Sequence, residues 1–302
     1  MPLAAPSVKL WLNALKFSSD VNARMYASKG ELCSYLIEIT AHILGYRDTD
    51  GAYLVDRIAD TAAQKGTGKW AGMTALSESV PLTLITEAVY ARCLSSQRTQ
   101  RIETAEVFSG LQTKAPDAVG TPVAEQSGTS AADSDEILQI LHDALYAAKI
   151  ISYAQGFELI KTADAHYGWG IDLGGLALLW RGGCIIRSVF LEKISEAYVR
   201  DKNVRNLIAD AYFSEVLRRT QLALRQAIMF ALSNGIPVPA LSAALAWFDG
   251  IRCTHLPANL LQAQRDYFGA HTYERTDRAR GVFFHTNWTG HGGETSSTSY
   301  TV

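Results

Sequence analysis

Residues 134–167 read SDEILQILHDALYAAKIISYAQGFELIKTADAHY, and this stretch decides the fold class. Its apolar residues recur at intervals of three and four, which is the period of an α-helix. Between Leu145 and Phe157 the apolar residues occupy more than one face of that helix. We therefore predict one long helix whose middle is buried on several sides.

The segments before this helix also follow the helical period. Residues 31–44 carry one apolar stripe, and GYRDTDG at 45–51 predicts a turn. Pro81 stands where the first turn of a helix tolerates proline, so residues 82–96 predict the next helix. From Gly110 to Asp133 the composition changes to Pro, Gly, Ser, Thr and Ala, which indicates a flexible loop between two helical halves.

The segments after the long helix predict further helices. Asp172 is placed to cap a short one that ends near residues 182–183, and others are expected over 184–199, 204–234, 241–250 and 257–268. The tail from His285 onward is rich in Gly, Ser and Thr and has no packing pattern. Strand signals are nearly absent and do not alternate with helices, so the sequence predicts an all-α fold without a Rossmann domain.

Composition excludes several classes of function. Of 302 residues, 48% are hydrophobic and 19% charged, and the net charge of -2 gives no reason to expect nucleic acid or an anionic membrane. No stretch approaches the 18 or so uninterrupted apolar residues of a membrane span. The four cysteines are scattered without a C-x-x-C pair, so we expect no metal site and a reduced, cytoplasmic protein.

The first candidate site is KGTGKW at residues 65–70. Two glycines, the hydroxyl of Thr67 and the charge of Lys65 in a loop before a helix are suited to a phosphate. The loop is neither a Walker motif nor a dinucleotide fingerprint, because Trp70 replaces the Ser or Thr that binds magnesium and no strand precedes it. An ordinary loop is the alternative.

Isolated cations form the second group of candidates. Arg92 interrupts an apolar helix, and from the pattern alone it is an ion-paired or partly buried structural arginine. Arg181 and Arg187 in WRGGCIIRS admit the same interpretation. In QRDYFGAH at 264–271, Arg265 and His271 are spaced to meet one anionic ligand, or they belong to a solvated helix end. HTNWTGHGG at 285–293 indicates a tail that docks at a specific place.

Seven segments in this order resemble the C-terminal domain of the 6-phosphogluconate dehydrogenase family. The resemblance runs from about residue 30 to the end of the chain. The segments are SYLIEIT (34–40), QKGTGKW (64–70), VPLTLITEAVYARCLSS (80–96), YAAKIISYAQGFELI (146–160), WRGGCIIRS (180–188), LPANLLQAQRDYFGAHTYE (256–274) and HTNWTGHGG (285–293).

This resemblance implies a large helical domain in a homodimer, each subunit's C-terminal tail reaching into its neighbour. It implies an enzyme of the pentose phosphate pathway that oxidises 6-phosphogluconate with NADP and, without a metal, decarboxylates the product to ribulose 5-phosphate and CO2. Carried over by motif, Lys65, Thr67 and Arg92 hold the sugar phosphate, and Arg265 and His271 do so from the partner subunit.

The sequence also departs from the family. The Rossmann domain that binds NADP, the lysine base and the glutamate acid belong to a preceding region that this chain does not match, and residues 1–28 do not resemble it. We expect a divergent segment 1–28, a helical substrate and dimerisation domain 29–284 with a flexible loop at about 110–133, and a tail 285–302. We therefore assign no catalytic residue and expect no turnover by the chain alone. The alternative is a non-catalytic dimerisation or regulatory partner of a full-length dehydrogenase subunit.

Overall fold

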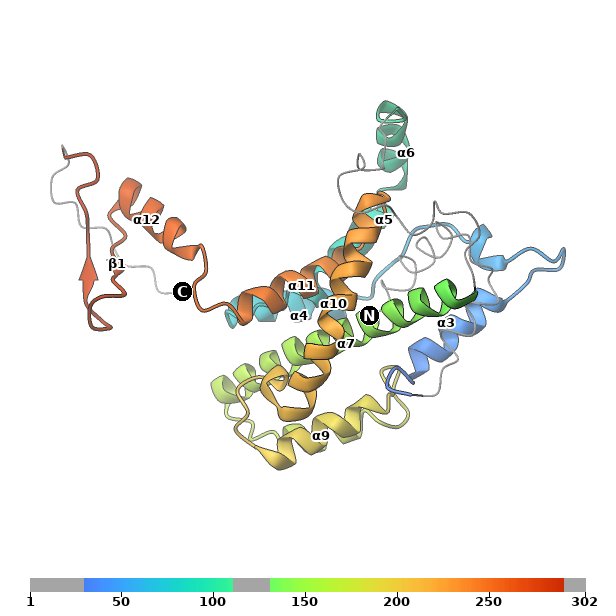
Figure 1. Ribbon diagram of the computed structural model, residues 1–302, viewed down its shortest axis with the longest axis horizontal. Helices are drawn as coiled ribbons and strands as arrows, with labels where there is room; N and C mark the ends of the chain where they lie inside the picture. Colours follow the sequence, from blue (N-terminus) through green and yellow to red (C-terminus); the bar gives the residue numbers. More distant parts are fainter. Residues whose placement is uncertain (1–29, 111–130, 291–302) are drawn as a thin grey trace. The chain divides into compact units, whose positions relative to one another are not determined.

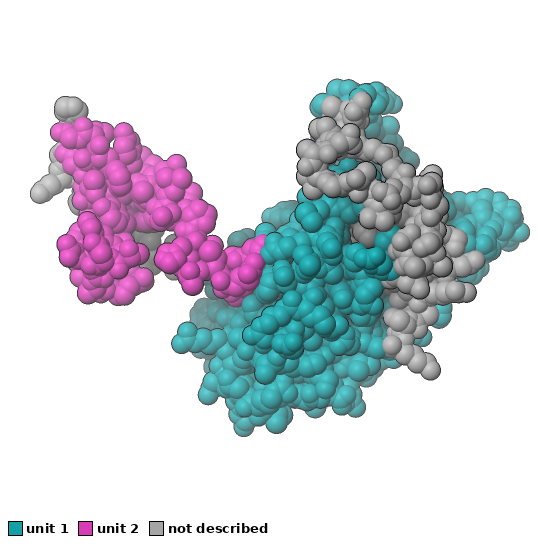
Figure 2. Space-filling view, viewed as in Figure 1, with its two compact units in different colours: residues 1–248 teal, residues 249–302 magenta. Residues whose placement is uncertain are grey.

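The computed structural model describes residues 30–110 and 131–290, which form parts of two compact units. One unit is residues 1–248 and the other residues 249–302 (Figure 2), and each is described by itself. The expected segment 1–28, most of the loop at 110–133 and residues 291–302 of the tail lie outside the described residues.

The first unit is built around helix α7, Ala131–Tyr167 (Figure 1). Tyr146, Ile151 and Phe157 on this helix are each no more than 1% exposed. Helix α10, Ala211–Ser233, packs along α7 and buries one face of its own. The predicted long helix with its middle buried on several sides is present, and the predicted all-α class is confirmed.

Shorter elements precede α7. They are α3 (Tyr35–Gly45), the 3-10 helix η1 (Leu54–Arg57), α4 (Thr67–Ser77), α5 (Thr83–Ser96) and α6 (Arg98–Val107). Helix α3 begins four residues later than the apolar stripe predicts, because Ser34 forms a β-bridge with Ser188 and the Tyr35 N–H donates to the Arg187 carbonyl at 3.0 Å. Helix α6 was not predicted, and none of its residues is buried, so it has no apolar stripe to reveal it.

The elements between α7 and the end of the first unit are α8 (Leu173–Leu179), α9 (Phe190–Arg200), the 3-10 helix η2 (Leu207–Ala209), α10 and α11 (Pro239–Ile251). Helix α9 begins six residues later than predicted, since residues 187–189 pair with residues 33–35. Asp172 stands at the start of α8 without a side-chain capping bond. Asp210 does cap α10, accepting from the Tyr212 and Phe213 N–H groups at 3.0 and 3.4 Å.

A buried lysine lies where residues 31–34 meet the start of α9. Lys149 of α7 is 3% exposed, and its Nζ donates to Ser188 Oγ at 2.6 Å, which in turn donates to the Cys33 carbonyl at 3.1 Å. Burial lowers the pKa of Lys149 from 10.5 to about 8, because an ammonium group is poorly solvated there. The two chain segments are thus joined through the Lys149 side chain, and folding disfavours its charged form.

The second unit contains α12 (Ala258–Gly269) and a short hairpin of β1 (Tyr273–Glu274) and β2 (Phe283–Phe284). The strands are antiparallel, with Tyr273 opposite Phe284. Among residues 249–290, only Asp266 and Ala270 are buried. Large apolar side chains of this unit are exposed, namely Ile251, Leu256, Leu260, Leu261, Tyr267, Phe268, Val282, Phe283 and Trp288. The described part of the second unit therefore has almost no hydrophobic core of its own.

Candidate phosphate-binding site

The KGTGKW motif lies at the N-terminus of α4. Gly66 is the N-cap residue with φ +95°, a left-handed conformation that favours glycine, and Thr67 is the first helical residue. Lys65 and Thr67 are both exposed. The N–H groups in the first turn of a helix have no acceptor within the helix, so they present donors and a partial positive charge to an anion. What the sequence predicted as a loop is therefore half loop and half helix start.

Helix α5 places Arg92 against the segment that leads into this motif. The Arg92 guanidinium donates to the Ala63 carbonyl, and Ser95 Oγ accepts from the Ala62 N–H at 3.0 Å. Gln64 Nε2 lies 3.6 Å from Cys93 Sγ. A carbonyl oxygen is neutral, so this bond fixes the arginine without cancelling its charge. The structure thus brings Arg92 to residues 62–64, immediately before Lys65.

The close approach of α4 and α5 depends on Gly68. A Cβ atom at this position would lie 2.7 Å from Val89 Cγ2 of α5. Beyond the motif, the end of α4 is tied to α7, because Glu78 lies 2.9 Å from His166 Nδ1. Glycine at 66 and glycine at 68 therefore serve different needs, the first a backbone conformation and the second a helix contact.

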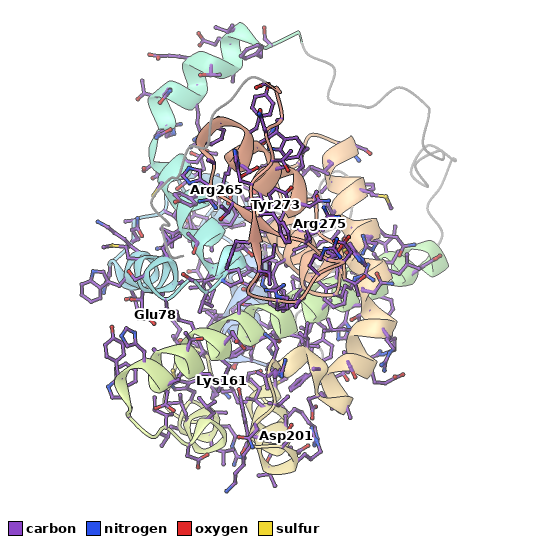
Figure 3. All side chains as sticks on the ribbon, turned by 90° about the vertical axis from the view of Figure 1, so that its left-hand side faces the viewer. Glu78, Lys161, Asp201, Arg265, Tyr273 and Arg275 are labelled. Atoms are coloured by element: carbon purple, nitrogen blue, oxygen red, sulfur yellow. The ribbon has the colours of Figure 1, made fainter. Side chains whose placement is uncertain are left out.

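The other two predicted residues, Arg265 and His271, lie in the second unit around the end of α12. Figure 3 labels Arg265 among the side chains. Its Nη1 donates to Gln262 Oε1 at 3.0 Å. Gln262 Nε2 donates to the carbonyls of His271 and Thr272 at 2.8 and 2.6 Å. The chain reverses at Ala270, which has φ +49°. The five predicted residues therefore form two groups, one in each unit.

Asp266, next to Arg265, anchors the beginning of the tail. Its side chain is fully buried and accepts from His285 Nδ1 at 2.9 Å, the Thr286 N–H at 3.0 Å and Trp288 Nε1 at 2.8 Å. Burial by itself raises the pKa of Asp266, but the bonds from His285, Thr286 and Trp288 outweigh it, so the pKa lies below its usual value. Because an ionised carboxylate only accepts, Nδ1 of His285 carries the proton.

Other candidates have structural contacts. Arg181 pairs with Glu192 at 2.8 Å, and Arg187 with Glu38 at 2.9 Å. Within residues 30–110 and 131–290, no three His, Cys, Asp or Glu side chains are grouped to hold a metal ion. No helix in that part of the chain is long and apolar enough to cross a membrane.

Sequence reasoning missed Gln262 and Asp266. The signal for Gln262 was its position one turn before Arg265, on the same face of the helix. Asp266 gave no signal, because a charged residue on an amphipathic helix is usually solvated, and its partners lie 19 to 22 residues further along the chain.

A family model described as "6-phosphogluconate dehydrogenase, C-terminal domain" matches residues 1–288. The chain belongs to the 6-phosphogluconate dehydrogenase family. The match includes residues 1–28, the segment predicted to be divergent.

Two curated members of the 6-phosphogluconate dehydrogenase family illustrate the extent of the similarity. The "6-phosphogluconate dehydrogenase, decarboxylating" of Treponema pallidum is 52% identical over 275 residues, which are 90% of this chain and 54% of that protein. The human protein of the same description is 47% identical over 302 residues, or 99% of this chain and 59% of its own length. The chain thus spans little more than half the length of these relatives.

The fold agrees with a solved structure of the family. Plasmodium falciparum 6-phosphogluconate dehydrogenase superposes with a TM-score of 0.85 at 36% identity, over 95% of this chain and 59% of that one. That enzyme is described in its apo form, with its cofactor NADP+ and with its substrate 6-phosphogluconate. This likeness extends the family assignment from the sequence to the arrangement of the helices.

Proposed function

We propose that this chain supplies the sugar-phosphate clamp and the dimer interface of an NADP-dependent 6-phosphogluconate dehydrogenase, which converts 6-phosphogluconate to ribulose 5-phosphate and CO2. The observation that carries the proposal is the placement of Lys65 and Thr67 at the start of α4, beside the segment that Arg92 contacts. The free thiols of all four cysteines support an enzyme of the reducing cytoplasm.

The chemistry of this group matches a phosphate monoester. Such a dianion is stabilised by several fixed cations and donors, and arginine offers two parallel N–H groups that fit two phosphate oxygens. The N-terminus of α4 adds backbone N–H groups and the positive end of its helix dipole. Arg92, Lys65 and Thr67 would therefore bind the phosphate end of the substrate, leaving its reactive carbons elsewhere.

We propose that Arg265 and His271 complete the clamp of a neighbouring subunit in a homodimer. The second unit exposes large apolar side chains and buries only Asp266 and Ala270 among its described residues. An apolar surface of this kind is characteristic of an obligate subunit interface. A second copy of this chain, or the matching domain of a full-length dehydrogenase subunit, is the partner that family membership supports.

The described residues do not fit the NADP cofactor. They contain only the hairpin of β1 and β2, with no strand that leads through a glycine-rich turn into a helix. No hydride or proton transfer is therefore assigned to residues 30–110 and 131–290. Its clamp binds ground state and transition state alike, which positions the substrate but does not by itself accelerate the reaction.

The test is reduction of NADP in the presence of 6-phosphogluconate, followed as the absorbance of NADPH. We expect no turnover by the chain alone and turnover after mixing with a separately expressed nucleotide-binding half of a relative. Turnover by the isolated chain would contradict the proposed lack of catalytic groups. If the mixture does not reduce NADP but the chain still binds the substrate through its phosphate, the chain is better explained as a non-catalytic partner of a full-length subunit.

A further inference from the structure

The side-chain amide of Gln262 touches both predicted phosphate-binding residues of the second unit. Its Oε1 accepts from Arg265 Nη1 at 3.0 Å, while its Nε2 donates to the His271 carbonyl at 2.8 Å and to the Thr272 carbonyl at 2.6 Å. A single half-buried side chain thus joins the guanidinium of one residue to the backbone of the other.

Only one orientation of this amide satisfies all three contacts. Turned over, its oxygen would face two carbonyl oxygens and its NH2 group would face a guanidinium, and each of these pairs repels. The three bonds therefore fix the amide in both position and direction. Glutamine is the residue that can donate on one side, accept on the other and leave the arginine's positive charge uncompensated.

The backbone turn after α12 makes this contact possible. Ala270 adopts φ +49° and is 5% exposed, and this reversal returns the chain to Gln262, nine residues before His271. Gly269 leaves room for the imidazole, because a Cβ there would lie 2.8 Å from His271 Nε2. Asp266 separately holds the end of α12 to residues 285–288.

We propose that Gln262 is a positioning residue that holds Arg265 and His271 in fixed register as one anion-binding group. The proposal rests on the phosphate clamp argued above. A free arginine side chain loses rotamer freedom when it binds a ligand, and a side chain already held in place loses less. Gln262 thereby raises the affinity for the phosphate group without touching it.

The test measures binding of 6-phosphogluconate to the complete chain by calorimetry, with gluconate, which lacks the phosphate, as the reference ligand. We expect Gln262→Leu to weaken 6-phosphogluconate binding roughly tenfold, equivalent to about 1.4 kcal/mol, and to leave gluconate binding unchanged. Gln264→Leu, the same change at an exposed position of α12, is the matched control and should bind like the unmodified chain.

A double-mutant cycle separates positioning from a general effect on the fold. If Gln262 acts through Arg265, Gln262→Leu should cost much less on an Arg265→Ala background than in the unmodified chain. A purely structural defect would add to the loss from Arg265→Ala. Additive losses, or equal losses for both ligands, would overturn the positioning role.

A second variant covers the case in which Gln262→Leu does not fold. Gln262→Glu keeps the volume and the contact with Arg265, but a carboxylate cannot donate to the two carbonyls and it compensates the guanidinium charge. We expect a folded protein with phosphate-specific weakening at neutral pH, and unchanged affinity would contradict the inference.

The outcomes also separate this inference from the proposed function. If Arg265→Ala weakens binding while both Gln262 variants do not, the clamp stands and the role of Gln262 falls. If Arg265→Ala has no effect, or the unmodified chain does not prefer 6-phosphogluconate to gluconate, the proposed clamp falls, and the role of Gln262 falls with it.

Discussion

Arg92 shows how one contact distinguishes an ion-paired arginine from one available to a ligand. Its described bond goes to the neutral Ala63 carbonyl, whereas Arg98 on the next helix faces the Asp60 carboxylate at 3.4 Å. We expect Arg92→Met to weaken 6-phosphogluconate binding at least tenfold, since a charge-assisted bond to phosphate contributes about 1.5–3 kcal/mol. Calorimetry checks this, with Arg98→Met as the control. Equal affinities for the two variants would remove Arg92 from the clamp.

Lys149 predicts how stability changes with pH. Its pKa falls from 10.5 in the unfolded chain to about 8 in the fold, so between these values the unfolded state binds more protons and stability rises with pH. From pH 8 to 9.5 this gain is about 1.5 kcal/mol for one such group. Below pH 8 the buried lysine lowers the unfolding free energy by its full amount, and this loss of stability diminishes as the pH rises above 8.

Urea unfolding of the unmodified chain and Lys149→Met at both pH values measures the effect. The variant lacks the titrating group, so its stability should rise less over this interval. Burial raises the pKa of Tyr153 to about 12 and acts on Tyr146 and Tyr198 in the same direction. These tyrosines are common to both proteins and cancel in the comparison. Parallel pH dependences would show that Lys149 does not titrate in this range.

Asp266 predicts the order of the tail segment. In Asp266→Leu, a side chain of similar size offers no acceptor, so His285, the Thr286 N–H and the Trp288 indole N–H all lose theirs. A buried unsatisfied group of this kind costs about 1–3 kcal/mol. We expect faster solvent exchange of the Trp288 indole N–H by NMR, with the signal assigned by its loss in Trp288→Phe.

Asp277→Leu is the control for Asp266→Leu, because Asp277 is an exposed partner of Arg275 in the same unit. The pKa of Asp266 lies below that of an unfolded aspartate, so its contribution persists at neutral pH and is lost only as pH falls through the folded pKa. An indole signal that exchanges equally in both variants would show that the carboxylate does not hold the tail.

The close contact between α4 and α5 predicts that an added side chain at Gly68 destabilises the fold. In Gly68→Ala the new Cβ would lie 2.7 Å from Val89 Cγ2, and valine is too stiff to move aside. We expect a loss of about 1–3 kcal/mol in unfolding free energy by thermal melting. On a Val89→Ala background, Gly68→Ala should lower the unfolding free energy much less than it does in the unmodified chain.

Gly156→Ala is the matched control in a helix interior. Its Cβ would meet Ile85 at 3.9 Å, an ordinary contact, so alanine should leave stability unchanged or raise it by up to about 1 kcal/mol. If Gly68→Ala melts like Gly156→Ala, the close approach of the two helices is not what requires glycine at position 68.

The elements also show what could be predicted from the sequence. Helix α7 was evident because its apolar period continues over many turns. The late starts of α3 and α9 were not, because the β-bridge between Ser34 and Ser188 joins segments far apart in the chain. Helix α6 was not predicted because none of its residues is buried, so its sequence has no apolar stripe. Local sequence patterns indicate burial and helix propensity. Helix boundaries that depend on pairing between distant segments can be seen only in the tertiary structure.

The candidate site follows the same division. KGTGKW indicated a phosphate site through residue types alone, but the division of its two glycines between Gly66 at a positive φ and Gly68 at a helix contact required coordinates. The link from Gln262 to His271 depends on the reversal at Ala270, a non-glycine residue in a left-handed conformation. Such a turn has no sequence signal when alanine occupies it.

We expect the C-terminal tail to support assembly of the proposed dimer. The segment beginning at His285 supplies the three described partners of the Asp266 carboxylate and therefore helps to shape the surface of the second unit. We expect removal of residues 285–302 to weaken the proposed dimer in sedimentation velocity. Removal of 291–302 alone, which keeps those partners, shows how much the Asp266 contacts contribute. An unchanged dimer after the longer deletion would contradict the role of the tail in assembly.

The sparse burial among residues 249–290 of the second unit also has a consequence for the lifetime of the chain in a cell. Exposed side chains such as Leu260, Tyr267, Phe268 and Phe283 are what chaperones and proteases recognise on an incompletely assembled protein. A copy without a partner should be unfolded locally and degraded first at its C-terminal end, while an assembled copy is protected. The amount of this protein would then follow the supply of its partner more closely than its own rate of synthesis.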